Sequence, residues 1–279
     1  MVYIITPLWK LANVELLESV IPDECHWIIV VDKAKSHEKI KLKSNNHTIL
    51  YPEGVPANDI GGYRNRDWVL DNFDFNDEDW IRHLDDDSPI HKDWFDNIKP
   101  YLDHDLGMIV WRTQTFHPVY IKSHSPSGLY GCWEYFYNRG KDDGMIGGFS
   151  PACIDACSHM AKWKYVKDVR FVMNEYPLSY HLYVTDKPYD YHARDACYSN
   201  VQHEKVGKGK TIFIDKYLGW WNVLRCYDPN CTAHEYCELF MENQYHLNIE
   251  DDKGVREVYW SMTPNNQYKK IIDKPYRRK

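Results

Sequence analysis

Short apolar runs alternate with amphipathic segments along the first 115 residues of the chain. The runs are rich in β-branched and aromatic residues, which is typical of buried strands. Between them, apolar side chains recur every three or four residues, as on one face of a helix. The predicted strands are VYIIT (2–6), HWIIVVD (26–32), HTILY (47–51), DWIRHLDDD (79–87) and LGMIVWRT (106–113), and the predicted helices are NVELLESVI (13–21), GGYRNRDWVLDNF (61–73) and KDWFDNIKPYL (92–102).

This alternation predicts the α/β fold class, with a mainly parallel central sheet flanked by helices. In such sheets, ligands bind beyond the carboxyl ends of the strands. Asp32 closes the second predicted strand, and Asp85, Asp86 and Asp87 close the fourth. We therefore expect these acids to share one crevice.

Three adjacent carboxylates repel one another, and burial disfavours their ionised form. A divalent cation would offset this cost, and carboxylate oxygens suit Mg²⁺ or Mn²⁺. If the strand geometry persists, Asp85 and Asp87 point to one side and Asp86 to the other. An inert, solvated acidic loop is the alternative. An EF-hand is excluded, because Pro89 and Ile90 stand where that loop needs an acid or amide and a glycine.

The pattern is less regular after residue 115. Residues 116–144 are rich in His, Tyr, Ser and Gly and resemble a loop, and GMIGGFSPACIDACSHM (144–160) predicts a Gly-rich turn that leads into a helix. Beyond residue 205 the chain is interpreted as an appended mixed or α-rich extension. The stretch VGKGKT (206–211) is not a P-loop, since Glu204 occupies the position of the first glycine and the following TIFI predicts a strand.

Composition narrows the class of partner. The net charge of −7 disfavours a nucleic-acid partner, because phosphate binding needs a basic face. No leader peptide and no apolar run long enough to span a bilayer are recognised, so the protein is expected to be soluble and cytoplasmic, or, if viral, to lie in the host-cell cytoplasm. The eight scattered cysteines favour reduced thiols, although Cys226, Cys231, Cys237 and His234 leave a zinc site open.

Six motifs in order resemble the inverting glucuronyltransferases, a family of GT-A fold glycosyltransferases. HWIIVVD, GGYRNRDWVL and WIRHLDDDS are similar to the family's HWIVVED, QRNxAL and YFADDDN. GGFSPACI (147–154), NEYPLSYHLY (174–183) and YHARD (191–195) are similar to its AGFAVN, QESxLLxxL and WHTRT. The likeness implies a catalytic domain over residues 1–205, with a nucleotide-binding half (1–115) and an acceptor half (116–205), followed by the extension 206–279. Its spacings differ from the family's, so donor sugar and acceptor do not transfer.

The resemblance implies transfer of a sugar from a UDP-sugar to a hydroxyl acceptor on a glycan, protein or small molecule, with inversion and with Mn²⁺ or Mg²⁺ as cofactor. Asp87 would hold the metal, and Glu175 would be the catalytic base. The remaining residues would contact the donor: Asp32 the base, Arg64 the diphosphate or the base, Asp85 and Asp86 the ribose, and His192 and Arg194 the diphosphate.

The chemistry of these residues suits glycosyl transfer independently of the resemblance. A cation with Arg64, Arg194 and His192 would stabilise the charge that develops on the leaving diphosphate. A carboxylate in hydrogen-bond reach suffices as base for the acceptor hydroxyl. For that base, Asp142 and Asp143 are alternatives to Glu175, which would equally suit the first turn of an ordinary helix. Two other functions stay open: a sugar nucleotidyltransferase, and a carbohydrate-binding protein without turnover.

Overall fold

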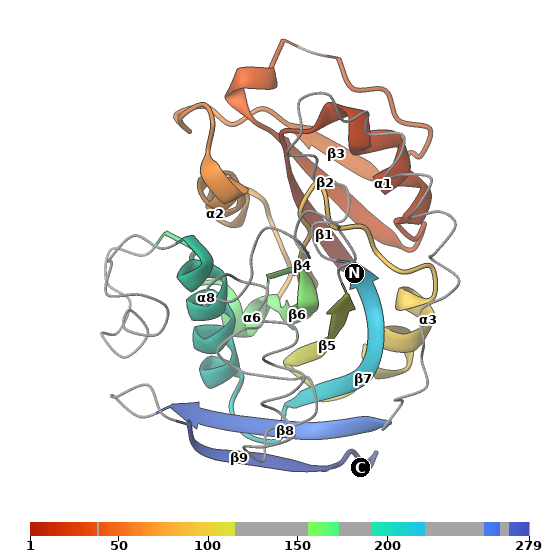
Figure 1. Cartoon of the computed structure of the whole chain (residues 1–279), viewed down its shortest axis with the longest axis vertical. Coiled ribbons are helices and arrows are strands. Elements are labelled where there is room, and N and C mark those ends of the chain that lie inside the picture. The colour runs from red at the N-terminus through yellow and green to blue at the C-terminus, as the bar shows by residue number, and fades with distance from the viewer. Residues whose placement is uncertain (38, 115–155, 173–190, 221–253, 263–267, 279) are drawn as a thin grey trace, which may run out of the picture.

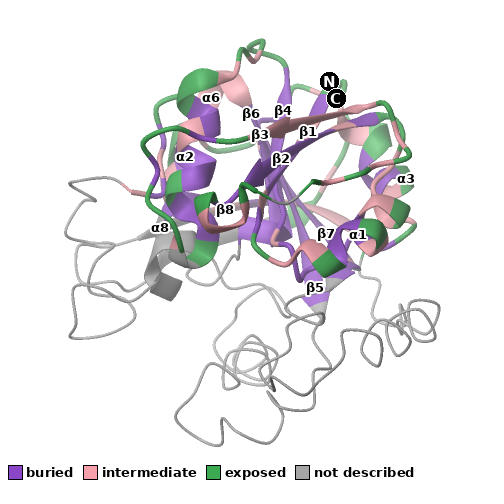
Figure 2. Cartoon of the chain, turned by 90° about the horizontal axis from the view of Figure 1, so that it is seen from above, coloured by how far each residue is buried: buried purple, intermediate pink, exposed green. Residues whose placement is uncertain are grey.

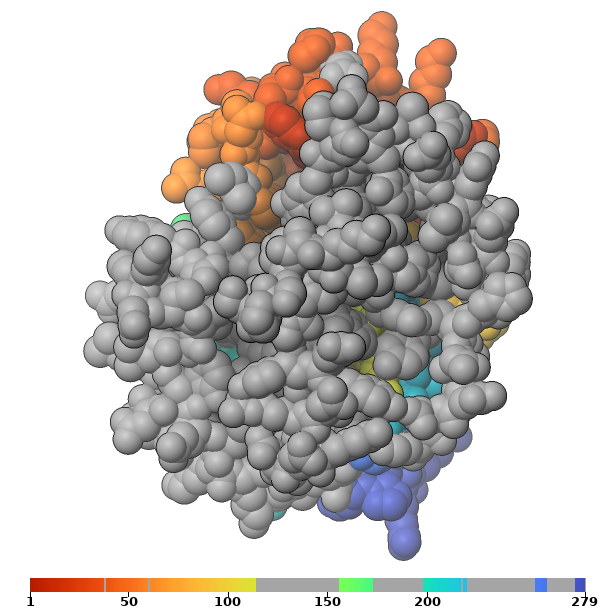
Figure 3. Space-filling model, viewed as in Figure 1, coloured from red at the N-terminus to blue at the C-terminus, as the bar shows by residue number. Residues whose placement is uncertain are grey.

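The structure is a computed structural model that describes residues 1–37, 39–114, 156–172, 191–220, 254–262 and 268–278 (Figure 1). In these ranges nine strands form one sheet in the order β3-β2-β1-β4-β6-β5-β7-β8-β9. Strands β3 and β9 therefore lie at opposite ends of the molecule (Figure 1, Figure 3). The predicted α/β class is confirmed.

The first half of the sheet is parallel and agrees with the sequence pattern. Strands β1 (Val2–Leu8), β2 (Cys25–Val31), β3 (His47–Leu50) and β4 (Trp80–His83) pair in parallel, with α1 (Val14–Val20) and α2 (Tyr63–Asn72) as connections between them. Each of these elements overlaps a predicted one. Asn13 lies at the start of α1, but its side chain does not cap the helix.

The second half of the sheet is mixed. Strand β6 (His159–Lys162) runs antiparallel to both β4 and β5 (Met108–Gln114), and β5 pairs in parallel with β7 (Thr211–Trp220). Strands β8 (Val255–Met262) and β9 (Tyr268–Pro275) continue from β7 in antiparallel pairs. The sheet is therefore parallel only in part, because a strand that runs the other way separates β4 from β5.

The described residues after 206 are strands of this same sheet, where the sequence favoured an appended mixed or α-rich segment. Strand β7 pairs with β5 over most of its length. The glycines of VGKGKT, Gly207 and Gly209, have φ values of 80° and 84° in the turn that leads into β7. Such left-handed conformations are those that glycine adopts without strain, so this motif makes a tight turn before a strand.

Helices cover both faces of the sheet (Figure 2). Side chains along the strands alternate between two apolar clusters. Ile4 and Ile29 face α1 and α3 (Trp94–Ile98), whereas their neighbours Ile5 and Ile28 face the other side. There they meet α2, α6 (Trp163–Val166) and α8 (Tyr191–Val206). In the described part of the chain, no helix combines the length and the apolarity that a membrane crossing requires.

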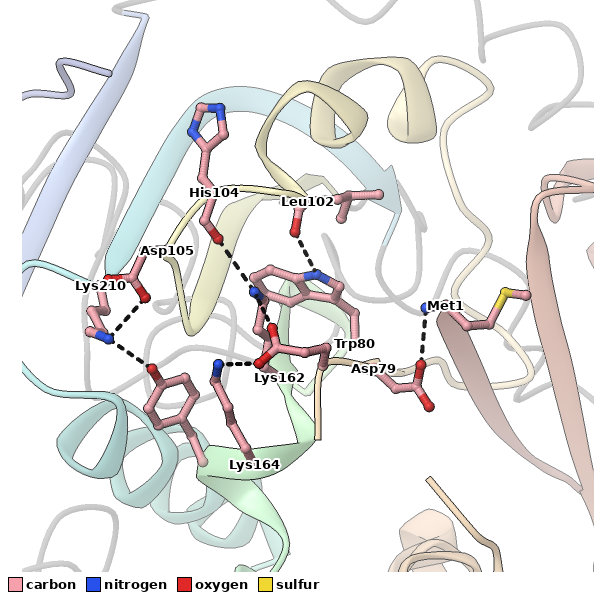
Figure 4. A network of polar contacts seen from close by, with 11 residues as sticks. Met1, Asp79, Trp80, Leu102, His104, Asp105, Lys162, Lys164 and Lys210 are labelled. Carbon is pink, nitrogen blue, oxygen red and sulfur yellow. Dashed lines mark hydrogen bonds and ion pairs between the residues drawn. The ribbon is translucent and has the colours of Figure 1, made fainter. Parts of the chain in front are cut away.

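Charged pairs tie the amino ends of the central strands together (Figure 4). The terminal amine of Met1 donates to Asp79 at 3.0 Å, just before β1 and β4 begin. Lys162 donates to Glu78 at 2.9 Å and to the carbonyl oxygen of His104 at 3.3 Å, and Lys164 pairs with Glu78 as well. This end of the sheet is stabilised by ion pairs between opposite charges.

Candidate functional site

The acids identified in the sequence lie at the carboxyl ends of β1, β2 and β4. The main-chain N–H of Asp32 donates to the carbonyl oxygen of Leu8 at 3.0 Å, and that of Leu84 donates to Ile5 at 2.9 Å. The segment after β1 thus runs between Asp32 on one side and the acid run Asp85–Asp87 on the other. These acids therefore lie at the same edge of the sheet, and their sharing of one crevice stays a prediction.

Asp32 is buried and holds a turn. Its Oδ1 accepts hydrogen bonds from the main-chain N–H groups of Ala34 at 2.8 Å and Asn58 at 3.0 Å. Its Oδ2 accepts from Asp59 N–H at 3.0 Å. Asn58 has a φ of 59°, a left-handed conformation that asparagine tolerates better than most residues. Asp32 therefore shapes the loop before α2, and its expected contact with a nucleotide base stays a prediction.

Asp86 anchors the segment that follows β1. Its Oδ2 accepts from the main-chain N–H groups of Trp9 at 2.7 Å and Lys10 at 2.5 Å, and its carbonyl oxygen accepts from Asn13 Nδ2 at 2.8 Å. The residue is only 8% exposed. Burial, and next the neighbouring charge of Asp87, raise the pKa of the Asp86 carboxyl to about 6. The raised pKa reflects the free-energy cost of keeping both carboxylates ionised next to each other.

Asp87 is paired with a lysine. Lys10 Nζ lies 2.5 Å from its Oδ2, and Ser88 Oγ donates to its Oδ1 at 3.2 Å. Lys10 thus holds two acids, Asp86 through its main chain and Asp87 through its ammonium group. Sequence reasoning missed this lysine, because its partner is 77 residues away along the chain.

Asp85 pairs with Arg66 on α2, a contact that sequence reasoning missed, and the expected contact of Arg64 with the donor stays a prediction. Arg66 Nη2 forms an ion pair with Asp85 Oδ1, and its Nη1 donates to the carbonyl oxygen of Gly61 at 2.6 Å. Arg64 is exposed. Residues two apart on a helix are separated by about 200°, so only one of the two arginines on α2 faces the strand ends.

The three carboxylates of the acid run bind different partners: Asp85 binds Arg66, Asp86 binds main-chain N–H groups, and Asp87 binds Lys10. In the ranges that the structure describes, no group of three or more His, Cys, Asp or Glu residues could hold a metal ion. Mg²⁺ in nucleotide sites is often bound through only one or two carboxylates, with phosphate oxygens as the other ligands. Asp87 fits that role, since its carboxylate is held by a displaceable lysine rather than by main-chain donors.

A second group lies on the other face of β4. His83 Nε2 is 2.9 Å from the hydroxyl of Tyr198, and burial holds the pKa of His83 well below its usual value. Phe171 stacks on Tyr198 with ring centroids 3.7 Å apart. The main-chain N–H groups of Phe171 and Val172 donate to the carboxylate of Asp67, each at 2.8 Å.

Asp67 thereby ties α2 to the residues that precede segment 173–190, the segment that contains Glu175. Sequence reasoning missed this anchor.

Several predicted site residues lie outside the described residues. Glu175 and its alternatives Asp142 and Asp143 do, as do Gly147, Gly148 and the cysteine-rich segment 226–237. His192 and Arg194 lie in the first turns of α8, but their side chains are not described. The described site therefore comprises Asp32 and the acid run together with Lys10 and Arg66.

Comparisons with known proteins identify no family for this chain. No family model matches the sequence, and no curated protein matches it significantly. The residues at the carboxyl ends of β1, β2 and β4 are therefore the basis for a functional proposal.

Proposed function

We propose that this protein is a metal-dependent glycosyltransferase of the GT-A type. It would move a sugar from a nucleoside-diphosphate donor, a UDP-sugar by resemblance, to a hydroxyl acceptor with inversion. The observation that carries this proposal is the acid run at the end of β4, where Asp86 and Asp87 are both buried. A protein that keeps adjacent carboxylates out of water at a strand end is prepared for a cationic ligand.

That ligand would displace the ammonium group of Lys10 from Asp87. Its side chain is about one quarter exposed, so it has solvent to move into, whereas the Asp87 side chain is 9% exposed. A cation bound at Asp87 would neutralise charge on the leaving diphosphate. The displaced ammonium of Lys10 stays near the site and would bind phosphate oxygens, as lysine does in other phosphate sites.

Trp9 supports a donor with a planar base. Its indole is 42% exposed, although its main-chain N–H is bound to Asp86. Lys35, three residues after Asp32, has its Nζ 5.3 Å from the centre of that ring. An exposed indole held beside the acid run offers a stacking face for a nucleotide base.

The transfer step itself needs a base. In the proposed reaction the acceptor oxygen forms a bond to the anomeric carbon, the bond from that carbon to the diphosphate oxygen breaks, and Glu175 takes the hydroxyl proton. Arg66, which is bound to Asp85, would keep that carboxylate ionised and in place. Inversion follows from a single displacement without a covalent intermediate.

A donor screen tests this proposal. The protein is incubated with Mn²⁺, nucleotide sugars based on UDP, GDP and CMP, and a mixture of acceptor glycosides, and nucleotide release and product mass are measured. We expect release from one nucleotide class that requires Mn²⁺ and is lost in Asp87→Asn, with Asp105→Asn at the amino ends of the strands as the control. No release from any donor would contradict the proposal.

A further inference from the structure

Three large side chains meet in the core on one face of the sheet: Arg82 on β4, Trp94 in α3 and Trp111 on β5. The Arg82 Cζ atom is 4.1 Å from the ring centroid of Trp94 and 4.8 Å from that of Trp111. The centroids of the two indole rings are 5.7 Å apart, and the angle between the ring planes is 71°. None of the three residues is more than 2% exposed. A guanidinium group is therefore enclosed by aromatic rings, away from water.

Arg82 carries a buried positive charge. Among the described residues, no carboxylate forms an ion pair with it. Burial lowers the pKa of Arg82 to about 9, which still leaves the group cationic at neutral pH. The faces of two indoles attract a cation, but less strongly than the loss of its hydration disfavours it. Something further is needed to offset the charge.

The hydrogen-bond donors of this cluster are unsatisfied as well. Within the described part of the chain, Nε and Nη1 of Arg82 and the indole Nε1 atoms of Trp94 and Trp111 are buried without an acceptor. Arginine and tryptophan side chains are donors only, so these residues cannot satisfy one another. Buried Trp27 differs, since its Nε1 donates to Thr6 Oγ1 at 2.9 Å. Several orphaned donors around one positive charge indicate a missing acceptor that is negatively charged.

We propose that Arg82, Trp94 and Trp111 form a buried site for a small monovalent anion of the chloride class. The anion accepts hydrogen bonds from the orphaned N–H groups and balances the guanidinium charge. It is small because the cluster is closed to solvent, and monovalent because the local charge is +1. This site is separate from the acid run, and it does not depend on the proposed glycosyl transfer.

Thermal unfolding tests the site. The melting temperature is measured over a range of sodium chloride concentrations, with sodium gluconate added to keep the ionic strength constant. We expect a rise of about 2–3 °C for each tenfold increase in chloride above the dissociation constant, because the anion binds the folded state alone. Arg82→Met should abolish this slope and Trp94→Phe should reduce it. Trp27→Phe, which removes a satisfied indole donor from the same cluster of apolar residues, should keep the slope.

Equal slopes in the wild type and Arg82→Met, or no chloride dependence in either, would overturn the proposal. A second measurement uses the unaltered protein, in case Arg82→Met does not fold. Crystals soaked in sodium bromide should show an anomalous peak within hydrogen-bond distance of the Arg82 guanidinium. Density without anomalous signal at this position would identify a water molecule and would equally overturn the proposal.

Discussion

Carboxylates at the two ends of the sheet differ in burial and in the direction of their pKa shifts. At the amino ends of the strands, Glu78 is 65% exposed, and hydrogen bonds from Lys164 and Lys162 lower its pKa to about 2 (Figure 4). At the carboxyl ends, Asp86 is buried beside Asp87, and its pKa is raised to about 6. At the amino ends the exposed Glu78 is paired with two lysines, whereas at the carboxyl ends two buried acids lie close together at a cost. That difference supports our proposal that the carboxyl ends carry the functional site, since a cation or cationic complex would offset the cost.

We expect the largest effect on stability at the carboxyl ends, at the ion pair between the buried Arg66 and the partly exposed Asp85. Arg66→Met leaves Asp85 without its partner and removes a fully buried guanidinium. Because breaking such a pair leaves an uncompensated charge, we expect the free energy of unfolding to fall by about 3 kcal/mol. Lys164→Met at the amino ends, and Arg64→Met on the exposed side of α2, should change it little. Urea titrations of the three variants measure this, and equal losses in Arg66→Met and Lys164→Met would contradict the contrast.

The pH dependence of stability should differ in sign between the buried Asp67 on α2 and the exposed Glu78 at the amino ends of the strands. Burial raises the pKa of Asp67 to about 6, so the folded state holds this proton after the unfolded state has lost it near pH 4. The stability contribution of Asp67 is therefore present below pH 4 and is lost as the pH rises to about 6. Glu78 has a lowered pKa, so its contribution is present above pH 4.5 and is lost as the pH falls toward 2.

Urea titrations between pH 3 and 7 separate these two contributions. Relative to the wild type, Asp67→Asn should gain stability by roughly 2 kcal/mol between pH 4 and pH 6.5. Glu78→Gln should lose stability relative to the wild type over pH 3 to 5, because it lacks the contribution that the wild type acquires there. If Asp67→Asn and Glu78→Gln changed stability with pH in the same direction, the predicted contrast between Asp67 and Glu78 would be contradicted.

A smaller effect concerns the lysine at the acid run. Lys10→Met removes the ammonium that occupies Asp87, while the main-chain donors to Asp86 remain. We expect the affinity for free Mn²⁺, measured by electron paramagnetic resonance, to rise roughly fivefold. Lys35→Met, which removes a positive charge next to Trp9 without touching Asp87, is the matched control. If both variants changed affinity equally, the effect would reflect overall charge rather than competition at Asp87.

Local patterns predicted the parts of the site that depend on single strands. The positions of Asp32 and Asp85–Asp87 at strand ends could be predicted, because the sequence shows where each apolar run stops at a polar residue. The ion pair between Arg66 and Asp85 was not predicted, because the sequence does not show which side of α2 faces the strand ends. Lys10 and Asp67 bind partners 77 and more than 100 residues away, and no periodicity reports such pairs. The joining of β7, β8 and β9 to the sheet is non-local in the same sense.

The central claim is that the acid run binds a metal–nucleotide complex. Calorimetric titration of UDP, GDP and CMP, each with and without Mn²⁺, tests it most directly in the wild type, in Asp87→Asn and in the control Asp105→Asn. The account predicts that one nucleotide binds only with Mn²⁺, and that its affinity falls at least about tenfold in Asp87→Asn alone. Nucleotide binding that is absent, or that is indifferent to both Mn²⁺ and Asp87, would contradict it.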